Sequence, residues 1–256
     1  MSTRVAVVVV TCALAWFGPG ASRAVPLGVY DGFEDGNTTV NLAWFDINPG
    51  HGTDGGVVAD PIRSGNLVWK AMGDEAAARY IATTNFAPIA WQGFHASVEY
   101  LTTTSSRFAG TIMVGDHWMP FDTTYKAFAV SVRHDIAWGN MVNLQMMDAN
   151  RNGPVIGYDK WFDLSLVPVN QWLRLDLWHD PATGLVRGAL RNSEGQVIVE
   201  NSLTPVSVGD DTSLGQIVIG PQEFEWQYMD NATLTPEPAT FAVLILGGLG
   251  AMRRRR

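Results

Sequence analysis

The sequence contains a single cysteine, Cys12, and fewer basic than acidic residues. One thiol cannot form an internal disulfide framework or a zinc site made of several cysteines. The 256 residues carry 17 lysines and arginines against 25 aspartates and glutamates, a formal net charge of −8. Nucleic-acid binding requires a cationic surface that neutralises phosphates, so no nucleic-acid partner is expected. The chain is 46% hydrophobic and 16% charged, which is too apolar for a disordered protein and sufficient for a core.

Several catalytic motifs are also absent. The sequence has no serine nucleophile elbow, no phosphate-binding loop and no dinucleotide-binding fingerprint. Its five histidines are too scattered along the chain to form a metal-binding motif. None of these common signatures therefore assigns a reaction to the chain.

The first 24 residues have the pattern of a secretory signal peptide. Arg4 precedes an apolar run from Val5 to Phe17, and a Gly-Pro-Gly break follows it. Ser22 and Ala24 are the small residues that signal peptidase reads, so cleavage is predicted after Ala24. A lipoprotein signal cut before Cys12 fits poorly, because the preceding residue is not Gly, Ala or Ser. Ordinary cleavage removes Cys12 and leaves a mature chain without cysteine.

The last 21 residues, 236–256, form a second segment that differs from ordinary domain sequence. Pro236, Glu237 and Pro238 predict a stiff extended stalk, because proline fixes φ and disfavours a helix before it. A helix over the apolar residues 239–252 would be ~21 Å long, shorter than the ~30 Å hydrocarbon core. The arginine run that follows, Arg253, Arg254, Arg255 and Arg256, would stay on the cytoplasmic side. The segment predicts a short anchor inserted transiently in the inner membrane.

These three linked elements at the C-terminus resemble the PEP-CTERM sorting signal, also called the ice-binding protein C-terminal domain. The resemblance covers about the last 22 residues and implies a Gram-negative bacterium with an exosortase. That membrane peptidase would recognise Pro236, Glu237 and Pro238 and remove the tail. The protein would then reach the cell surface or the extracellular matrix. The alternative is a plain membrane tail that contains Pro-Glu-Pro.

Residues 25–235 predict one all-β domain. Short stretches with alternating polarity are separated by Gly, Pro, Asn and Asp. The clearest stretch is Trp172 to Trp178, in which three leucines point to one face and polar or aromatic residues to the other. The other predicted strands are Leu67–Met72, Arg79–Phe86, His95–Leu101, Gly110–Val114, Lys126–Arg133, Met141–Met147, Leu185–Arg191, Gln196–Glu200, Gln216–Ile219 and Phe224–Leu234. Roughly a dozen strands predict a two-sheet antiparallel β-sandwich (jelly roll), or a barrel.

Three stretches resemble the concanavalin A-like lectin/glucanase sandwich, which includes laminin-G-type modules. Asp31 to Gly36 is similar to the opening strand and turn of that family. Gln171 to Leu177 followed by Thr183 to Gly188 is similar to its central hairpin, and Tyr228 to Asn231 to its closing strand. The resemblance implies one sandwich over residues 29–234. A carbohydrate-binding-module jelly roll fits almost as well.

Catalysis is not expected from this sequence. Glucanases of the resembled fold carry two or three carboxylates on alternate residues of one strand, where period two brings them within about 7 Å. The nearest arrangement here is Glu223 and Glu225, with Asp230 farther along. An acidic strand edge explains it, so a glycoside-active enzyme is kept only as the alternative.

One segment matches the spacing of a calcium loop. Asp148, Asn150, Asn152 and Asp159 fall at positions one, three, five and twelve, with Gly153 at the turn position. Calcium is therefore a possible cofactor, although the flanking segments are predicted strands. The alternative is a hairpin closed by Asn152-Gly153.

Nine of the ten tryptophans follow the predicted signal peptide. Trp172 and Trp178 share a strand face with Arg174 and Asp176. Aromatic rings beside polar groups on an exposed sheet face can stack on sugar rings, so these four residues are the predicted ligand site. An interior second face of the sandwich explains them as well.

The combined expectation is a secreted, exosortase-sorted, non-catalytic sandwich that meets extracellular polysaccharide or another matrix component. A purely structural matrix protein is a further alternative. The predicted signal peptide and the C-terminal segment contain six of the arginines and Glu237. Without them, residues 25–235 have 11 basic and 24 acidic residues. The exported domain therefore has a net charge near −13, in contrast to the −8 of the whole chain.

Overall fold

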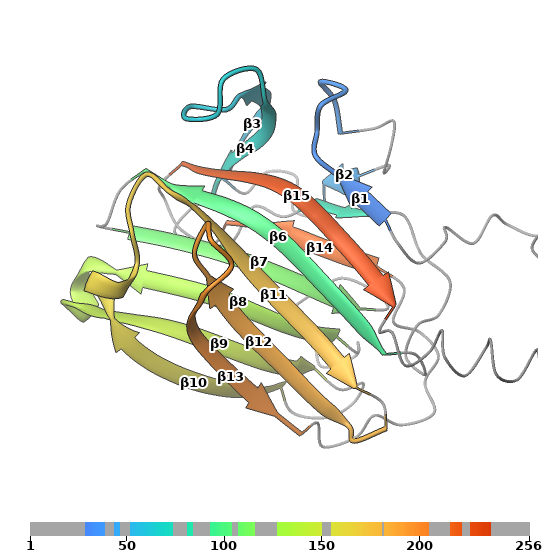
Figure 1. Ribbon diagram of the computed structural model, residues 1–256, viewed down its shortest axis with the longest axis vertical. Helices are drawn as coiled ribbons and strands as arrows, with labels where there is room; N and C mark the ends of the chain where they lie inside the picture. The colour runs from blue at the N-terminus through green and yellow to red at the C-terminus, as the bar shows by residue number, and fades with distance from the viewer. Residues whose placement is uncertain are drawn as a thin grey trace, which may run out of the picture.

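The computed structural model describes residues 29–38, 44–46, 52–73, 81–83, 93–103, 107–115, 127–149, 155–180, 182–204, 216–221 and 226–236. These residues form two antiparallel sheets that lie face to face (Figure 1). The front sheet has the order β13 (Val197–Leu203), β12 (Leu185–Arg191), β11 (Trp172–Asp180), β6 (Phe94–Thr102), β15 (Gln227–Pro236), β4 (Leu67–Met72) and β3 (Thr53–Ala59), and β1 (Val29–Asp31) also pairs with β15. The back sheet has the order β10 (Val155–Asp163), β9 (Met141–Ala149), β8 (Ala127–Asp135), β7 (Arg107–Gly115), β14 (Gln216–Gly220), β5 (Ile81–Thr83) and β2 (Trp44–Asp46).

The predicted all-β sandwich of two antiparallel sheets is confirmed. Two strands, β4 and β12, have the predicted bounds, and most others differ by one to three residues at an end. Within the described ranges the only helical segments are two 3-10 turns, Ile136–Trp138 and Leu164–Leu166. No helix in that part of the chain is long and apolar enough to cross a membrane. The two predicted helices, in the signal segment and in 239–252, lie outside the described residues.

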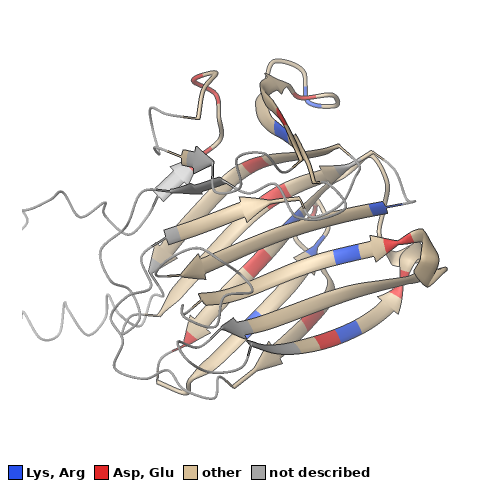
Figure 2. Ribbon diagram, turned by 180° about the vertical axis from the view of Figure 1, so that it is seen from behind, with Lys and Arg blue, Asp and Glu red and all other residues tan. Residues whose placement is uncertain are grey.

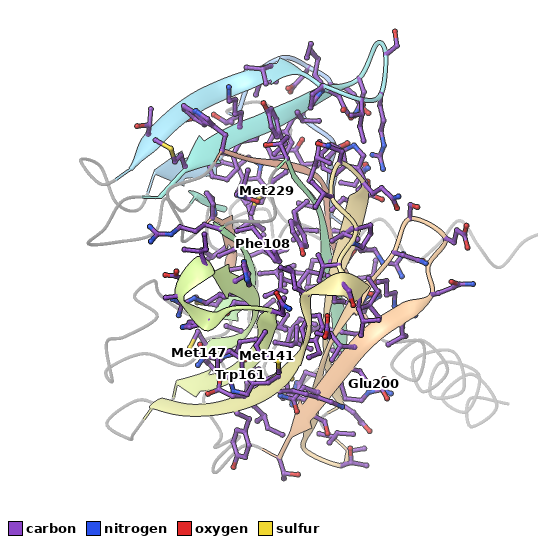
Figure 3. All side chains as sticks on the ribbon, turned by 90° about the vertical axis from the view of Figure 1, so that its left-hand side faces the viewer. Phe108, Met141, Met147, Trp161, Glu200 and Met229 are labelled. Atoms are coloured by element: carbon purple, nitrogen blue, oxygen red, sulfur yellow. The ribbon has the colours of Figure 1, made fainter. Side chains whose placement is uncertain are left out.

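The hydrophobic core lies between the sheets and consists mainly of alternate residues of the strands. Phe108 on β7 and Met229 on β15 are both buried in it, and Figure 3 shows them between the sheets. The two sheets approach each other closely at Gly188 on β12. A Cβ atom at this position would lie 2.6 Å from Cγ2 of Val130 and 3.0 Å from Sδ of Met146. A residue without a side chain is therefore needed for this approach.

Two long strands were not predicted. β3 covers Thr53–Ala59, which contains two glycines and is absent from the predicted strands. β10 covers Val155–Asp163, which overlaps the predicted calcium loop. In both segments, turn-forming residues made the strand unrecognisable from the sequence. Each strand nevertheless pairs with a neighbouring strand along its whole length.

Candidate functional site

The four residues predicted to form a ligand site lie on the outer face of the front sheet. On β11, Trp172, Arg174, Asp176 and Trp178 alternate with three buried leucines that point into the core. The register places Arg174 beside Glu99 of β6 and Trp178 beside His95 of β6. On the other side of β11, Arg174 pairs with Arg191 and Trp178 with Arg187 of β12. The four predicted residues are therefore brought together with four neighbours that the sequence analysis did not include.

Asp176 is the centre of an ionic cluster on this face. Its side chain is 0% exposed, although it lies on the outer side of the sheet. His95 Nε2 lies 2.7 Å from Asp176 Oδ1, and Arg191 Nε lies 2.8 Å from Oδ2. Arg174 Nε lies 3.1 Å from Oδ1. Three nitrogen donors thus cover both carboxylate oxygens, which compensates for the removal of the carboxylate from water. We call these four residues the Asp176 cluster.

Trp178 packs against the same cluster. His95 stacks on its indole ring with centroids 4.7 Å apart and an interplanar angle of 10°. The guanidinium carbons of Arg187 and Arg191 each lie 5.5 Å from the centroid of the Trp178 ring. Cation–π attraction of this kind holds the guanidinium groups over the sheet. The ring is partly buried by side chains of the chain itself.

Trp172 differs from the exposed platform that was predicted. Its side chain is 3% exposed and packs against Val68 and Leu101. The guanidinium carbon of Arg63 lies 4.6 Å from the Trp172 ring centroid. Arg63 comes from the turn between β3 and β4, so a distant segment covers the ring. The two tryptophans share a face, as predicted, but Trp172 does not present an open ring.

The same arginine joins a second group of polar residues. Arg63 Nη1 donates to Glu99 Oε2 at 2.7 Å and to Asp230 Oδ2 at 3.4 Å. Asn66 Nδ2 donates to Asp230 Oδ2 at 2.8 Å, and Asn231 Nδ2 donates to Glu99 Oε2 at 2.8 Å. These contacts fasten the β3–β4 turn to the centre of the front sheet. Asp230 had been considered with Glu223 and Glu225, and those two residues lie outside the described ranges.

Burial changes the acidity of Asp230. The side chain is 1% exposed, and loss of solvation raises the pKa of Asp230 from 3.8 to about 6. The hydrogen bond from Asn66 lowers the pKa and the nearby carboxylate of Glu99 raises it, but both effects are smaller than that of burial. The group is therefore a carboxylate at neutral pH that takes up a proton in mildly acidic solution.

The predicted calcium ligands are not all on one loop. Asp148 lies on β9 and pairs with Ile156, whereas Asp159 lies on β10 and pairs with Gln145. The two aspartates are thus separated by three residue pairs, about 10 Å along the strands. Asn150 and Asn152 lie outside the described ranges. Among the described residues there is no group of three or more histidine, cysteine or acidic side chains suited to a metal ion.

Asp159 instead belongs to a row of polar residues on the outer face of the back sheet. Thr111, Ser131, Gln145 and Asp159 lie side by side on β7, β8, β9 and β10. Asn143 Nδ2 and Gln145 Nε2 both donate to Asp159 Oδ1, each at 3.0 Å. We call Thr111, Ser131, Gln145, Asp159 and Asn143 the back-sheet polar row.

An exposed tryptophan lies at the end of this row. Trp161 pairs with Asn143 and is 44% exposed, which is high for so large an apolar side chain. Trp138, in the 3-10 turn after β8, packs its ring edge-on against Trp161 with centroids 4.9 Å apart. The guanidinium carbon of Arg133 lies 5.6 Å from the Trp138 centroid. The Trp161 ring is therefore supported by Trp138 and exposed to solvent beside amide and carboxylate groups.

Sequence reasoning missed this second face. The alternation of Asp159, Trp161 and Asp163 was a usable signal for a strand, because the three residues recur with a period of two. Because Asp159 was assigned to the predicted calcium loop, this strand pattern was not recognised. The contact between Trp161 and Trp138 could not be found from spacing alone, because it depends on the turn between β8 and β9.

The predicted terminal signals are described only at one residue. β15 ends at Pro236, whose backbone pairs with Phe94 of β6. Ala24, Glu237, Pro238 and the terminal arginines lie outside the described residues. Pro236, the first residue of the predicted stalk, is therefore the last residue of β15.

Comparison with known proteins supports the fold. No protein-family model and no curated protein sequence matches the chain. The CBM2 module of the evolved Dit protein of Lactobacillus casei BL23 phage J-1 is similar with a TM-score of 0.53 and 7% identity, over 82% of this chain and 98% of that chain. The binding domain of botulinum neurotoxin serotype D is similar with a TM-score of 0.51 and 12% identity, over 82% of this chain. The chain spans 48% of that botulinum structure. At these identities the likeness shows a shared β-sandwich fold.

Proposed function

We propose that this chain is an exported, non-catalytic β-sandwich that binds extracellular polysaccharide. The observation that carries the proposal is the exposed ring of Trp161, braced by Trp138 beside the back-sheet polar row. An exposed aromatic face offers a stacking surface for the apolar face of a sugar ring. Gln145 and Asp159 offer an amide and a carboxylate group for its hydroxyls, and the buried Asn143 donates to the same carboxylate.

The fold is compatible with this role. The similar phage protein is described as a CBM2 module and the similar toxin segment as a binding domain. Both have sandwiches of low sequence identity to this chain, so they support a binding scaffold and leave the ligand to be derived from the site. The concanavalin A-like resemblance of the sequence supports the same class of ligand.

Binding is tested with the exported protein on immobilised neutral polysaccharides, by affinity gel electrophoresis. Trp161→Ala should weaken binding about tenfold, which corresponds to the ~1.4 kcal/mol that a stacked ring contributes. Ile136→Ala is the matched control, because Ile136 is 62% exposed in the neighbouring turn and is not part of the row. Equal mobility of Trp161→Ala and wild type in every polysaccharide would contradict the proposal.

A glycoside-active enzyme is the second candidate. Glu99 and Asp230 are both contacted by Arg63, and the pKa of Asp230 is raised. Two neighbouring carboxyl groups, one of them with a raised pKa, are a combination that glycosidases use. Release of reducing ends from a bound polysaccharide, abolished by Glu99→Gln, would favour this candidate. The Trp172 ring beneath Arg63 and the hydrogen bonds from Asn66 and Asn231 favour a structural role for the pair.

Export and sorting complete the proposal. Signal peptidase would cut after Ala24, and an exosortase would recognise Pro236, Glu237 and Pro238 and release the protein to the surface or matrix. Mass spectrometry of the protein recovered from its host tests both steps. A mature chain that begins at Val25 and lacks Arg253 to Arg256 is expected. A recovered chain that retains the arginines would contradict removal of the tail.

A further inference from the structure

The three arginines on the front sheet form a cationic patch in an acidic domain. Arg174, Arg187 and Arg191 lie on the outer face of the adjacent strands β11 and β12. They are three of the 11 basic residues in 25–235, whose net charge is near −13. On the back sheet, by contrast, residues of both signs lie near one another on β8 (Arg133, Asp135) and on β10 (Asp159, Lys160, Asp163) (Figure 2). Such a local concentration of one sign focuses the field at one place on the surface.

The Asp176 cluster holds two of these arginines in place. Arg174 and Arg191 each direct Nε to the Asp176 carboxylate, at 3.1 Å and 2.8 Å. Their side chains remain 41% and 23% exposed, whereas Asp176 is 0% exposed. The buried carboxylate of Asp176 thus orients the guanidinium groups of Arg174 and Arg191. A ligand that meets oriented guanidinium groups loses less conformational entropy on binding.

Arg187 carries a charge that no carboxylate in the described part of the chain pairs with. Its side chain is exposed, and the contact it makes there is with the Trp178 ring, 5.5 Å from its guanidinium carbon. Glu200 of β13, opposite Ala189, is a further acidic group on this face (Figure 3). Asp176 and Glu200 therefore lie among the three arginines, whereas Glu99, opposite Arg174, forms an ion pair with Arg63.

We propose that Arg174, Arg187 and Arg191, with Trp178, bind the carboxylate groups of an acidic polysaccharide. The planar guanidinium fork matches a carboxylate with two parallel hydrogen bonds. Trp178, stacked on His95, contacts the guanidinium groups of Arg187 and Arg191 and so helps to hold them at the site. The acidic remainder of the domain repels a polyanion, so contact is confined to this patch and weakens with salt. This inference rests on the proposed polysaccharide binding and names a ligand class for a second face.

The test compares the full-length protein on sodium alginate and on carboxyl-reduced alginate, which has the same backbone without the charge. Wild type should bind alginate at least tenfold more tightly than the reduced polymer at low salt. Arg187→Gln should lose about tenfold in alginate affinity, because Arg187 makes no ion pair within the described fold and its removal leaves the Asp176 cluster intact. Lys160→Gln is the matched control, because Lys160 is an exposed cation on β10, outside the patch. Glu200→Gln should bind alginate more tightly than wild type.

The outcomes separate the two proposals. Equal affinity for both polymers, or equal affinity of Arg187→Gln and Lys160→Gln for alginate, would overturn the carboxylate site. In that case, a loss of neutral-polysaccharide binding in Trp161→Ala would still support the proposed function. Alginate binding that depends on Arg187 supports the inference even where Trp161→Ala retains neutral-polysaccharide binding. Failure of every polysaccharide to bind would overturn both.

Discussion

The buried carboxylate of Asp230 predicts an unusual pH dependence of stability. Its pKa is raised from 3.8 in the unfolded chain to about 6 in the folded protein. The folded state therefore holds the proton more tightly, so the favourable contribution is complete below pH 3.8 and is lost as the pH rises through 6. At ~1.36 kcal/mol for each pH unit, the free energy of unfolding should fall by up to about 3 kcal/mol across this interval. Most carboxylates in proteins produce the opposite slope in acid.

The measurement is urea unfolding from pH 3.5 to 7, followed by tryptophan fluorescence, for wild type and Asp230→Asn. The difference in unfolding free energy between the two isolates Asp230 from all other carboxyls, including Asp31, whose pKa burial also raises. Relative to the variant, wild type should lose stability as the pH increases toward 7. A constant difference across the range, or one that increases with pH, would refute the assignment of a buried, desolvated carboxyl to Asp230.

Three further predictions concern packing, the ionic cluster and metal. Gly188→Ala should destabilise the fold by about 1–3 kcal/mol, measured by urea unfolding. Adding Val130→Ala should recover part of that loss, because both changes act at the same contact. Strictly additive effects of the two substitutions would contradict a contact between these residues. Asp176→Ala should cost about 1–3 kcal/mol in the same assay, because Arg174, Arg191 and His95 lose a shared partner but stay partly exposed to water, and a change below 0.5 kcal/mol, about half of one such bond, would contradict this. Neither calcium nor a chelator should shift the melting temperature, because Asp159 accepts bonds from Asn143 and Gln145; a rise with calcium would restore the calcium loop.

The sequence predicted the architecture well because a period of two has a direct physical cause. Alternate residues of a strand point to opposite sides, so a half-buried strand shows its pattern locally. The outer face of β11, with Trp172, Arg174, Asp176 and Trp178, follows from that rule alone. The bounds of β4 and β12 were found in the same way. These features depend on neighbours within one strand.

The environment of that face could not be predicted, because it depends on residues far away in the chain. Arg63 covers Trp172 from a turn that lies more than a hundred residues upstream. His95 and Arg191 reach Asp176 from two different strands. Spacing within a strand does not show which strands become neighbours. Trp172 is therefore buried and does not form an open platform, although the four side chains share one face of the sheet, as their alternation predicted.

The position of β15 has a consequence for how the molecule is made. β15 hydrogen-bonds to β6 along one edge and to β4 and β1 along the other, so the last strand of the described residues occupies the middle of the front sheet. Until residue 236 has emerged, the edges of β6 and β4 that pair with β15 have unpaired backbone groups, and such edges are sites of aggregation. The front sheet therefore closes only after residues 227–236 have been synthesised and translocated. A chain interrupted shortly before β15 would keep most of its sequence and yet lack the strand that joins the two halves of its sheet.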